Sequence, residues 1–253
     1  MKQRPSFPAR LDSTLAPSPR KKPAPLPPPP PGHGMDSRAV RQRMVQKLAA
    51  QGISDPQVLG AMETVERHRF VDSALVNQAY EDTSLPIGLG QTISKPGVVS
   101  RMLELLLQGP LGNPHKLGRV LEIGTGCGYQ AAVLSLLATE VYSIERLRGL
   151  HDKARDNLRA LRLPNLHLLF GDGMAGFAKG APYAGIIAAA GGEAVPQAWV
   201  DQLAVGGRLV APVVTVGAPG GAQALLVLDK TSQGVRQSLL EAVHFVPLKS
   251  GVA

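Results

Sequence analysis

The sequence predicts an α/β protein built on a doubly wound, mostly parallel sheet with helices on both faces. Three observations favour this class. Short, almost wholly apolar runs suited to buried parallel strands alternate with amphipathic stretches between residues 119 and 214. A glycine-rich turn at residues 124–128 follows the first run and precedes a helical pattern. The 253-residue chain is 44% hydrophobic, which is enough for a sizeable core.

The first 34 residues differ in composition from the rest of the chain. They carry six Lys or Arg side chains against a single Asp, so most of the formal net charge of +8 lies here. The run KKPAPLPPPPPGHG favours polyproline II and offers no periodic apolar face to bury. We therefore expect residues 1–34 to form a disordered, basic, proline-rich tail. A docking peptide for a proline-binding groove, or an electrostatic tether, is the alternative.

A helical extension is expected at residues 35–110, ahead of the sheet. Apolar residues recur at helical spacing after Ser37, after Asp55 and after Pro96. Ser94 stands where the N-cap of the third helix is expected. Residues 67–94 show no regular pattern, and so long a loop in a compact domain indicates a binding role.

The alternation that follows is Rossmann-like. Residues 35–253 are expected to form one domain, with the extension at 35–110, a cofactor-binding core at 111–214 and C-terminal strands at 215–253. AQALLVLDK and VRQSLLEAVHFVPL predict two strands that complete the sheet in antiparallel fashion. In the core we expect strands at 119–123, 140–145, 165–170, 184–190 and 207–214, and helices at 128–138, 147–161 and 196–204.

Composition excludes several classes of function. The single cysteine, Cys127, cannot form an internal disulfide or a cysteine-based zinc cluster, and it favours a reducing compartment. No stretch approaches the roughly 18 apolar residues of a membrane span, and no secretory signal is recognisable. We expect a cytoplasmic monomer with no membrane partner and no metal.

Acidic side chains lie at the ends of three successive predicted strands. Glu122 precedes the glycine turn, Glu145 ends the next strand, and Asp172 follows the third. The carboxyl ends of neighbouring parallel strands meet at one sheet edge, where ligands bind in doubly wound folds. An acid placed like Glu145 can hold both hydroxyls of a ribose. The pattern therefore predicts a nucleoside site.

The glycine spacing indicates which nucleoside. Gly124, Gly126 and Gly128 are evenly spaced, unlike the G-x-G-x-x-G fingerprint, in which a helix N-terminus receives a pyrophosphate. We expect these glycines to let the main chain approach the ligand, with Thr125 between them. A carboxylate of Glu122 at the mouth would repel pyrophosphate but attract a cation. S-adenosylmethionine carries a ribose, a sulfonium and an ammonium but no phosphate, so it is the cofactor that the pattern favours.

The third acid completes this hypothesis. Asp172 can accept a hydrogen bond from the adenine amino group, and Gly173 can leave room for the ring. Two of the acids also have a plain interpretation: Glu122 as a capped, solvated acid, and Asp172-Gly173 as an ordinary turn. The hypothesis depends on all three acids lying at one sheet edge.

The chain resembles the protein-L-isoaspartate O-methyltransferase family. The similarity rests on LPIGLGQTISKP, VLEIGTGCGYQAAVLS, VYSIER, GDG, APY, QLAVGGRLVAPV and VHFVPL, in this order, from about residue 38 to residue 248. The glycine turn alone indicates only a class I methyltransferase. QTIS and FVPL are the segments specific to the family.

The resemblance implies repair of damaged proteins, in which a methyl group passes to the free carboxylate of an L-isoaspartyl residue. It places the cofactor on residues 122–128, Glu145, Asp172, Gly173 and the QTIS segment. Ser94 matches the active-site serine of the family. The partners implied are isoaspartyl-containing proteins and peptides, not nucleic acid.

The chemistry needs no general base, because a carboxylate is already ionised at neutral pH. Ser94 would therefore position the substrate carboxylate rather than act as a nucleophile, with the main-chain groups of Thr92 and Ile93 nearby. Ser94 also has the plain interpretation of a helix N-cap.

Two further features favour structural roles. Cys127 has no neighbouring histidine in the sequence, and we expect it to pack under the glycine turn. Phe70 is expected in the core, with its basic neighbours Arg67, His68 and Arg69 at the surface, where they could attract carboxylates.

Three positions depart from the family pattern: Ala184, Ala189 and Val214. Ala184 starts a strand away from the ligand edge, so a structural effect is expected. Ala189 lies near the ligand end of that strand and puts a fine contact in doubt. Val214 replaces a common glycine and is expected to alter the next turn.

Two other functions remain as alternatives. One is a methyltransferase acting on RNA or a small molecule, although AAAGGE after the fourth core strand lacks the polar-aromatic motif of many base methyltransferases. The other is a binding module whose tail recruits a partner. Methylation of an isoaspartyl peptide beside its aspartyl counterpart separates these alternatives from protein repair.

Overall fold

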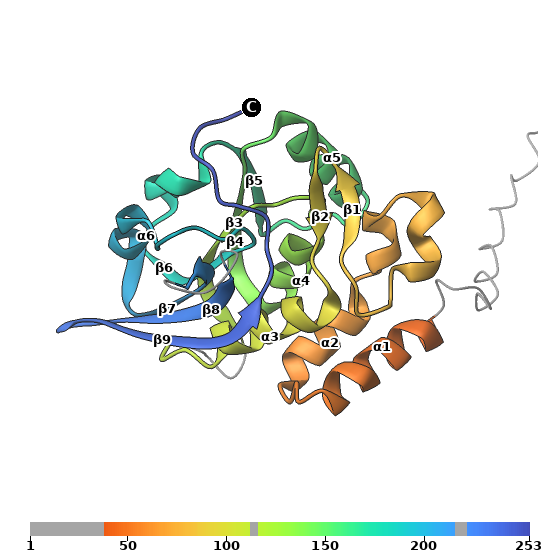
Figure 1. The fold of residues 1–253 in the computed structure, drawn as a ribbon, viewed down its shortest axis with the longest axis horizontal. Helices are drawn as coiled ribbons and strands as arrows, with labels where there is room; N and C mark the ends of the chain where they lie inside the picture. The colour runs from red at the N-terminus through yellow and green to blue at the C-terminus, as the bar shows by residue number, and fades with distance from the viewer. Residues whose placement is uncertain (1–37, 112–115, 216–221) are drawn as a thin grey trace, which may run out of the picture. The chain divides into compact units, whose positions relative to one another are not determined.

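Seven strands form one sheet in the order β5-β4-β3-β6-β7-β8-β9 (Figure 1). The computed structural model describes residues 38–111, 116–215 and 222–253, so the tail predicted at 1–34 lies outside the described residues. The first five strands in this order, β5, β4, β3, β6 and β7, run parallel to one another. β8 and β9 join antiparallel at the β7 edge, as predicted. The strands are β3 (Leu117–Ile123), β4 (Ala138–Glu145), β5 (Leu166–Phe170), β6 (Tyr183–Ala188), β7 (Leu203–Val214), β8 (Gln223–Thr231) and β9 (Gly234–Val243).

Residue alternation along the strands divides the hydrophobic core into two layers. Val120 and Val141 face a cluster that includes side chains of the first five helices. Leu121 and Ile186 face a second cluster that contains Trp199. Helices therefore cover both faces of the sheet, as expected. They are α1 (Arg38–Ala50), α2 (Pro56–Thr64), α3 (Pro96–Leu107), α4 (Tyr129–Leu137) and α5 (Arg148–Arg159) on one face and α6 (Gln197–Gln202) on the other.

The end of α6 differs from the sequence prediction. A helix was expected over 196–204 and a strand from 207, but β7 already begins at Leu203, which pairs with Tyr183 of β6. The register shifts between Tyr183 and Gly185, so a bulge absorbs the extra residues. Residues 203 and 204, which the local periodicity assigned to the helix, therefore belong to β7, which pairs with β6.

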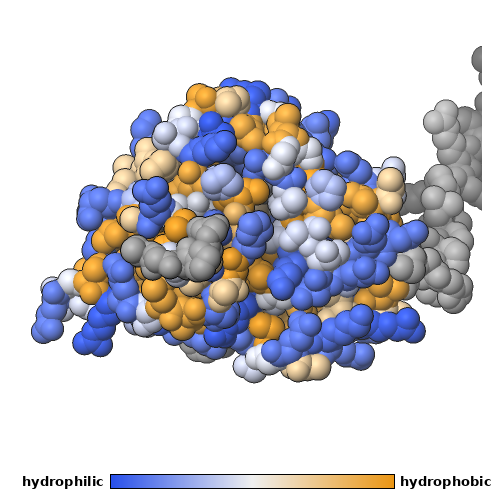
Figure 2. Space-filling view, viewed as in Figure 1, coloured by the Kyte–Doolittle hydropathy of each residue, from blue (hydrophilic) through white to orange (hydrophobic). Residues whose placement is uncertain are grey.

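The helical extension begins as the sequence indicates. The carboxylate of Asp55 accepts hydrogen bonds from the backbone N–H groups of Gln57 and Val58, which caps α2. α1 buries Met44 and Leu48 and presents hydrophilic side chains on the face drawn in Figure 2. None of the helices in the described residues is both long and apolar enough to cross a membrane.

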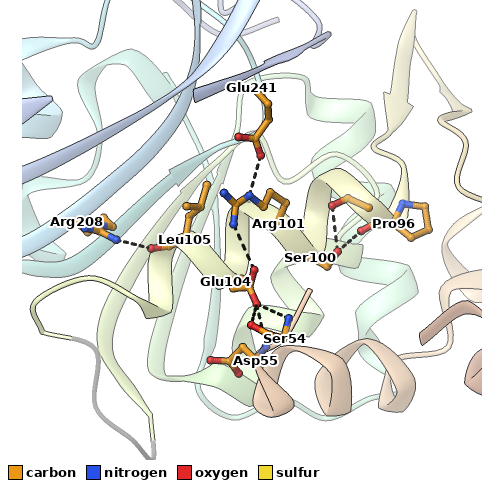
Figure 3. Close-up of polar contacts among 10 residues, drawn as sticks. Ser54, Asp55, Pro96, Ser100, Arg101, Glu104, Leu105, Arg208 and Glu241 are labelled. Atoms are coloured by element: carbon orange, nitrogen blue, oxygen red, sulfur yellow. Dashed lines mark hydrogen bonds and ion pairs between the residues drawn. The ribbon is translucent and has the colours of Figure 1, made fainter. Parts of the chain in front are cut away.

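A buried carboxylate joins α3 to the loop between α1 and α2 (Figure 3). Oε1 of Glu104 accepts hydrogen bonds from the backbone N–H groups of Ser54 (2.7 Å) and Asp55 (2.9 Å), and Oε2 lies 3.4 Å from Arg101. Arg101 also forms an ion pair with Glu241 of β9. Burial acts to raise the pKa of Glu104, but these hydrogen bonds and the Arg101 charge outweigh it and lower the pKa.

The segment 67–94 is more regular than expected. It contains two 3₁₀ turns, η1 (Arg67–Phe70) and η2 (Ser73–Gln78), and a hairpin of β1 (Leu85–Gly88) and β2 (Gln91–Ile93). Three consecutive residues at its tip have positive φ: Gly88 (99°), Leu89 (53°) and Gly90 (68°). The strands are too short for their alternation to be recognised in the sequence.

Candidate active site

A cavity of about 510 Å³ lies at the carboxyl edge of the parallel strands. One side of the cavity is lined by residues after β3, at the end of β4 and after β6. The other sides are lined by the β1–β2 hairpin and by residues 246–249. Its size suits a small-molecule site. The sequence-predicted site residues that line it are Thr92, Ile93, Ser94, Gly124, Thr125, Gly126, Glu145 and Gly173. Three others, Glu122, Gly128 and Asp172, are not among its lining residues.

The backbone of the glycine turn explains its glycines. Gly124, Gly126 and Gly128 have φ values of +89°, +56° and +92°, a region that side chains other than glycine rarely adopt. A Cβ at Gly128 would also lie 2.7 Å from Cδ1 of Leu158 in α5. We expected ligand approach to be the reason for these glycines. The turn conformation and, at Gly128, the packing of α5 already require them.

Gly173 is also required by the packing around it. A Cβ there would lie 2.6 Å from Cγ2 of Ile123, so the position is closed to a side chain by β3. Its carbonyl oxygen accepts a 2.8 Å hydrogen bond from Nε1 of Trp199, which attaches η3 (Gly173–Ala175) to α6. Gly173 thus brings bare backbone to the cavity wall.

Glu145 is the acid that lines the cavity. It is 4% exposed, and its two oxygens accept 2.9 Å hydrogen bonds from the backbone N–H groups of Gly126 and Leu147. The first bond fixes the glycine turn to the end of β4. Each carboxylate oxygen retains a second lone pair, so both can accept a further hydrogen bond from a ligand hydroxyl.

Glu122 does not stand at the mouth of the site, contrary to the sequence prediction. It is 0% exposed, and Oε2 accepts a short hydrogen bond from the hydroxyl of Ser143, which also meets the hydroxyl of Thr125. Burial raises the pKa of Glu122 to about 8, against the opposing effect of the hydrogen bond from Ser143. The carboxyl group is therefore mainly protonated at neutral pH, and it presents no charge to a ligand.

Asp172 lies at the expected sheet edge but has different hydrogen-bond partners from the one predicted. Oδ1 accepts from the backbone N–H of Met174 (2.9 Å) and caps η3, whereas Oδ2 accepts from the N–H of Gly251 (2.7 Å). After β9 the chain runs back across the carboxyl edge of the sheet (Figure 1). Asp172 fixes this C-terminal segment, and both of its oxygens have backbone partners. It follows β5 at the same sheet edge as Glu145, as predicted.

Ser94 lines the cavity but does not cap α3. The N-cap position belongs to Lys95, whose side chain makes no capping bond, so the N-cap interpretation of Ser94 is wrong. The carbonyl oxygen of Ser94 accepts a 2.8 Å hydrogen bond from Nη2 of Arg67. Arg67, expected at the surface, is 0% exposed, and it lies directly behind the wall formed by Ser94 and Tyr129.

Cys127 lies in the turn, 3% exposed, and burial raises the pKa of its thiol. It is buried in the turn as expected, and it is also one of the lining residues of the cavity. Ala189 lines the cavity beside Gly124, whereas Ala184 lies against Gly118 in the sheet. The backbone N–H of Val214 bonds to the carbonyl oxygen of Gly192 at the end of β7, and the turn expected to change after it includes residues 216–221, which lie outside the described residues.

Sequence reasoning from the residues missed several cavity walls. The glycine-rich hairpin tip gave only a loop signal, and the C-terminal segment was indicated only by the family resemblance. These lining residues are Ile87, Leu89, Gly90, Tyr129, Leu147, Leu150, Val246, Pro247, Leu248 and Lys249, whereas Gln91 belongs to the QTIS segment that the resemblance had indicated.

The cavity offers binding groups rather than an acid–base pair. Glu145 is its only carboxylate among the described residues, and both of its oxygens have backbone partners. No cluster of three His, Cys, Asp or Glu side chains that could hold a metal occurs within residues 38–111, 116–215 and 222–253. Such a site suits a reaction driven by positioning.

Comparison with known proteins agrees with these features. The family model described as "Protein-L-isoaspartate(D-aspartate) O-methyltransferase (PCMT)" matches residues 39–253. A protein-L-isoaspartate O-methyltransferase of Methylibium petroleiphilum is 61% identical over 221 residues, which cover 87% of this chain and 81% of the relative. One of Leptothrix cholodnii is 60% identical over 223 residues, which cover 88% and 77%.

Solved structures share the fold. One protein-L-isoaspartate O-methyltransferase superposes with a TM-score of 0.72 at 26% identity, over 84% of this chain and 67% of that chain. A Plasmodium falciparum protein, described as a beta-aspartate methyltransferase in complex with S-adenosyl-L-homocysteine, gives a TM-score of 0.70 at 23% identity, over 83% and 98%. At that identity the second comparison shows the fold alone.

The parallel core with its glycine turn, and the antiparallel pair at its edge, are those of a class I methyltransferase. The match extends over nearly all the described residues, including the hairpin and the C-terminal segment. The chain belongs to the protein-L-isoaspartate O-methyltransferase family.

Proposed function

We propose that this chain transfers a methyl group from S-adenosylmethionine to the free carboxylate of L-isoaspartyl residues in damaged proteins and peptides. One observation carries this proposal: a single cavity joins the glycine turn and Glu145 on one side to Thr92, Ile93 and Ser94 on the other. A nucleoside on the first side and a carboxylate on the second would therefore meet.

The lining fits the cofactor by its chemistry. Each carboxylate oxygen of Glu145 can accept one more hydrogen bond, as a ribose diol would supply, and Gly124, Thr125, Gly126 and Gly173 provide close backbone. We assign cofactor contacts to these residues. Glu122, Gly128 and Asp172 support the same wall from behind, through the turn, the packing of α5 and the C-terminal segment.

When bound, S-adenosylmethionine supplies an electrophilic methyl group on a sulfonium. The residues near Ser94 would hold one carboxylate oxygen of the substrate against this methyl group, which would pass to that oxygen while the sulfur keeps the electron pair of the broken carbon–sulfur bond. No proton is transferred, which agrees with the lack of an acid–base pair in the lining. The hydroxyl of Ser94 and the main chain of Thr92 and Ile93 orient the carboxylate, and the walls exclude water.

The proposal also covers the partners, the location and the oligomeric state of the chain. We propose isoaspartyl-containing proteins as the partners, action in the cytoplasm, and a monomeric state. The family supports the first of these. The cytoplasmic location rests on the sequence composition.

The test compares two peptides that differ only in one linkage. The full chain is incubated with methyl-labelled S-adenosylmethionine and either an L-isoaspartyl peptide or its normal aspartyl counterpart. We expect base-labile methyl ester on the isoaspartyl peptide alone. Equal labelling of both peptides, or labelling of RNA in preference to them, would overturn the proposal.

A further inference from the structure

Arg67 is a buried cation without an ionic partner among the described residues. Its side chain is 0% exposed, and no carboxylate in the described part of the chain lies within salt-bridge distance of it. A charge removed from water is costly unless an opposite charge or hydrogen bonds compensate it. Buried arginines are normally paired, so the missing anion needs an explanation.

Two hydrogen bonds hold the guanidinium in place but leave it incomplete. Nε donates to the carbonyl oxygen of Ala79 and Nη2 to that of Ser94, both at 2.8 Å. Nη1 is buried and has no hydrogen-bond partner in the described residues. The guanidinium also lies 4.8 Å from the centre of the Tyr129 ring. Ser94 and Tyr129 both line the cavity, so the cation lies directly behind its wall.

The neighbours do not supply a negative charge at neutral pH. Burial raises the pKa of Tyr129 to about 12 and also raises that of Cys127, so both are neutral. Asp82 acts on Arg67 only at longer range, and it accepts from the backbone N–H of Gly97 and faces Lys95. Burial lowers the pKa of Arg67, but a guanidinium stays protonated in proteins.

We propose that Arg67 is a positioning residue whose charge, held behind Ser94, attracts and orients the substrate carboxylate. The anion that the fold lacks is then brought by the acceptor. This inference rests on the proposed function and names the residue that selects an ionised acceptor. Arg67 acts in two ways: it fixes the backbone at Ser94 and provides an uncompensated positive charge across the wall. The charge acts through a dry wall, where it is screened less than at the surface.

The site of action is the acceptor rather than the cofactor. Arg67 holds the segment of Ser94, which we assign to the substrate, and it contacts neither Glu145 nor Gly126. In the glycine turn it interacts with the buried thiol of Cys127, a residue to which we assign no cofactor contact. Substitution should therefore affect peptide binding and leave cofactor binding unchanged.

The test measures selectivity for charge without turnover. The full chain, saturated with S-adenosylhomocysteine, is titrated with an isoaspartyl peptide and with its analogue in which the free carboxylate is a neutral carboxamide. The wild type should prefer the carboxylate peptide. In Arg67→Met the preference should fall by at least about tenfold, because only the charged peptide loses an attraction. Affinity for S-adenosylhomocysteine should change less than about twofold.

Matched variants keep the result interpretable. Arg69→Met removes an exposed arginine two residues away that pairs with Glu66, and it should keep the wild-type preference. Arg67→Lys keeps the charge but not the fork of hydrogen bonds, so it should restore part of the preference. If Arg67→Met does not fold, the comparison of Arg67→Lys with Arg67→Gln decides: a lysine variant no more selective than the glutamine variant would overturn the inference.

The outcomes separate this inference from the proposed function. A wild type that neither binds nor methylates the isoaspartyl peptide would contradict the function itself. A wild type that prefers the carboxylate, together with an Arg67→Met variant of equal preference, would contradict only the role of Arg67. That second result would assign Arg67 to structure alone.

Discussion

Oε2 of Glu145 accepts a 2.9 Å hydrogen bond from the backbone N–H of Gly126. This bond connects the end of β4 to the glycine turn after β3, which are neighbouring strands. The acid expected to hold the ribose therefore also holds the turn expected to lie beside it. Cofactor binding and turn geometry are coupled through one side chain, and the predictions below follow from this arrangement and from the buried groups around it.

Replacement of Ser94 should affect catalysis rather than cofactor binding. Ser94→Ala removes one donor from the acceptor side of the cavity, and we expect kcat/KM for an isoaspartyl peptide to fall by about 10–100-fold. Affinity for S-adenosylhomocysteine, measured by calorimetry, should stay within about twofold. The exposed Ser73→Ala provides a control with wild-type kinetics. Undiminished turnover in Ser94→Ala would remove this residue from the mechanism.

Glu122 should make stability fall with rising pH. Its pKa is about 8 in the folded chain and near 4.5 otherwise, so the fold gains from the protonated form at low pH. That contribution is complete below about pH 4.5 and lost as pH rises towards 8. Glu122→Gln cannot ionise, so its stability relative to wild type should rise by about 1–3 kcal/mol between pH 5 and pH 8.

Urea denaturation followed by circular dichroism measures this difference at each pH. The partly exposed Glu140→Gln, on the neighbouring strand, is the control and should show no comparable trend. A constant difference between wild type and Glu122→Gln across this range would mean that Glu122 is ionised in the fold.

Glu104 should have the opposite pH dependence. Its folded pKa is lowered, so its contribution is present above the unfolded value and lost as pH falls through the folded value. Glu104→Gln should lose about 2 kcal/mol at pH 7, because Ser54 and Asp55 lose a charged acceptor. The loss should diminish below about pH 4 in the same denaturation series. The exposed Glu81→Gln is the control, and an equal loss at all pH values would contradict the ionic role.

The proline-rich tail should be dispensable for the reaction. The lining found in the described part of the chain runs from Ile87 to Lys249, and residues 1–34 have no periodic apolar face, so removing them should leave kcat/KM for an isoaspartyl peptide within about twofold. Steady-state kinetics of the full and shortened chains provide the comparison. A large loss in the shortened chain would give the tail a catalytic or structural role.

The sheet was predictable from sequence because each core strand is a continuous apolar run between turn residues. The antiparallel edge and the capped start of α2 were predicted for similarly local reasons. Burial of individual polar groups was not predictable. Glu122 occupies an alternating strand position whose direction depends on the whole sheet, and Arg67 sits in a basic tetrapeptide, RHRF, that reads as surface. Both are buried by segments distant in sequence.

In the site, too, the features set by local sequence patterns were predictable and those set by distant segments were not. Glu145 and the glycine turn were predictable because parallel strands place their carboxyl ends together. Asp172 was correctly placed at this edge, but its partner Gly251 lies 79 residues away, so its engagement by the C-terminal segment left no local signal. The hairpin that closes the cavity consists of two strands too short to show alternation.

The most direct test of the central claim is calorimetry of nucleoside binding to Glu145→Ala. We predict an affinity loss of about 10–100-fold for S-adenosylhomocysteine, since a buried acceptor for the ribose is removed. 5′-Methylthioadenosine keeps the ribose and lacks the amino-acid portion, so it should lose the same factor. Glu140→Ala, near the other end of β4, should bind both ligands as the wild type does. Unchanged affinity of Glu145→Ala for both ligands would contradict the assignment of this sheet edge to the nucleoside.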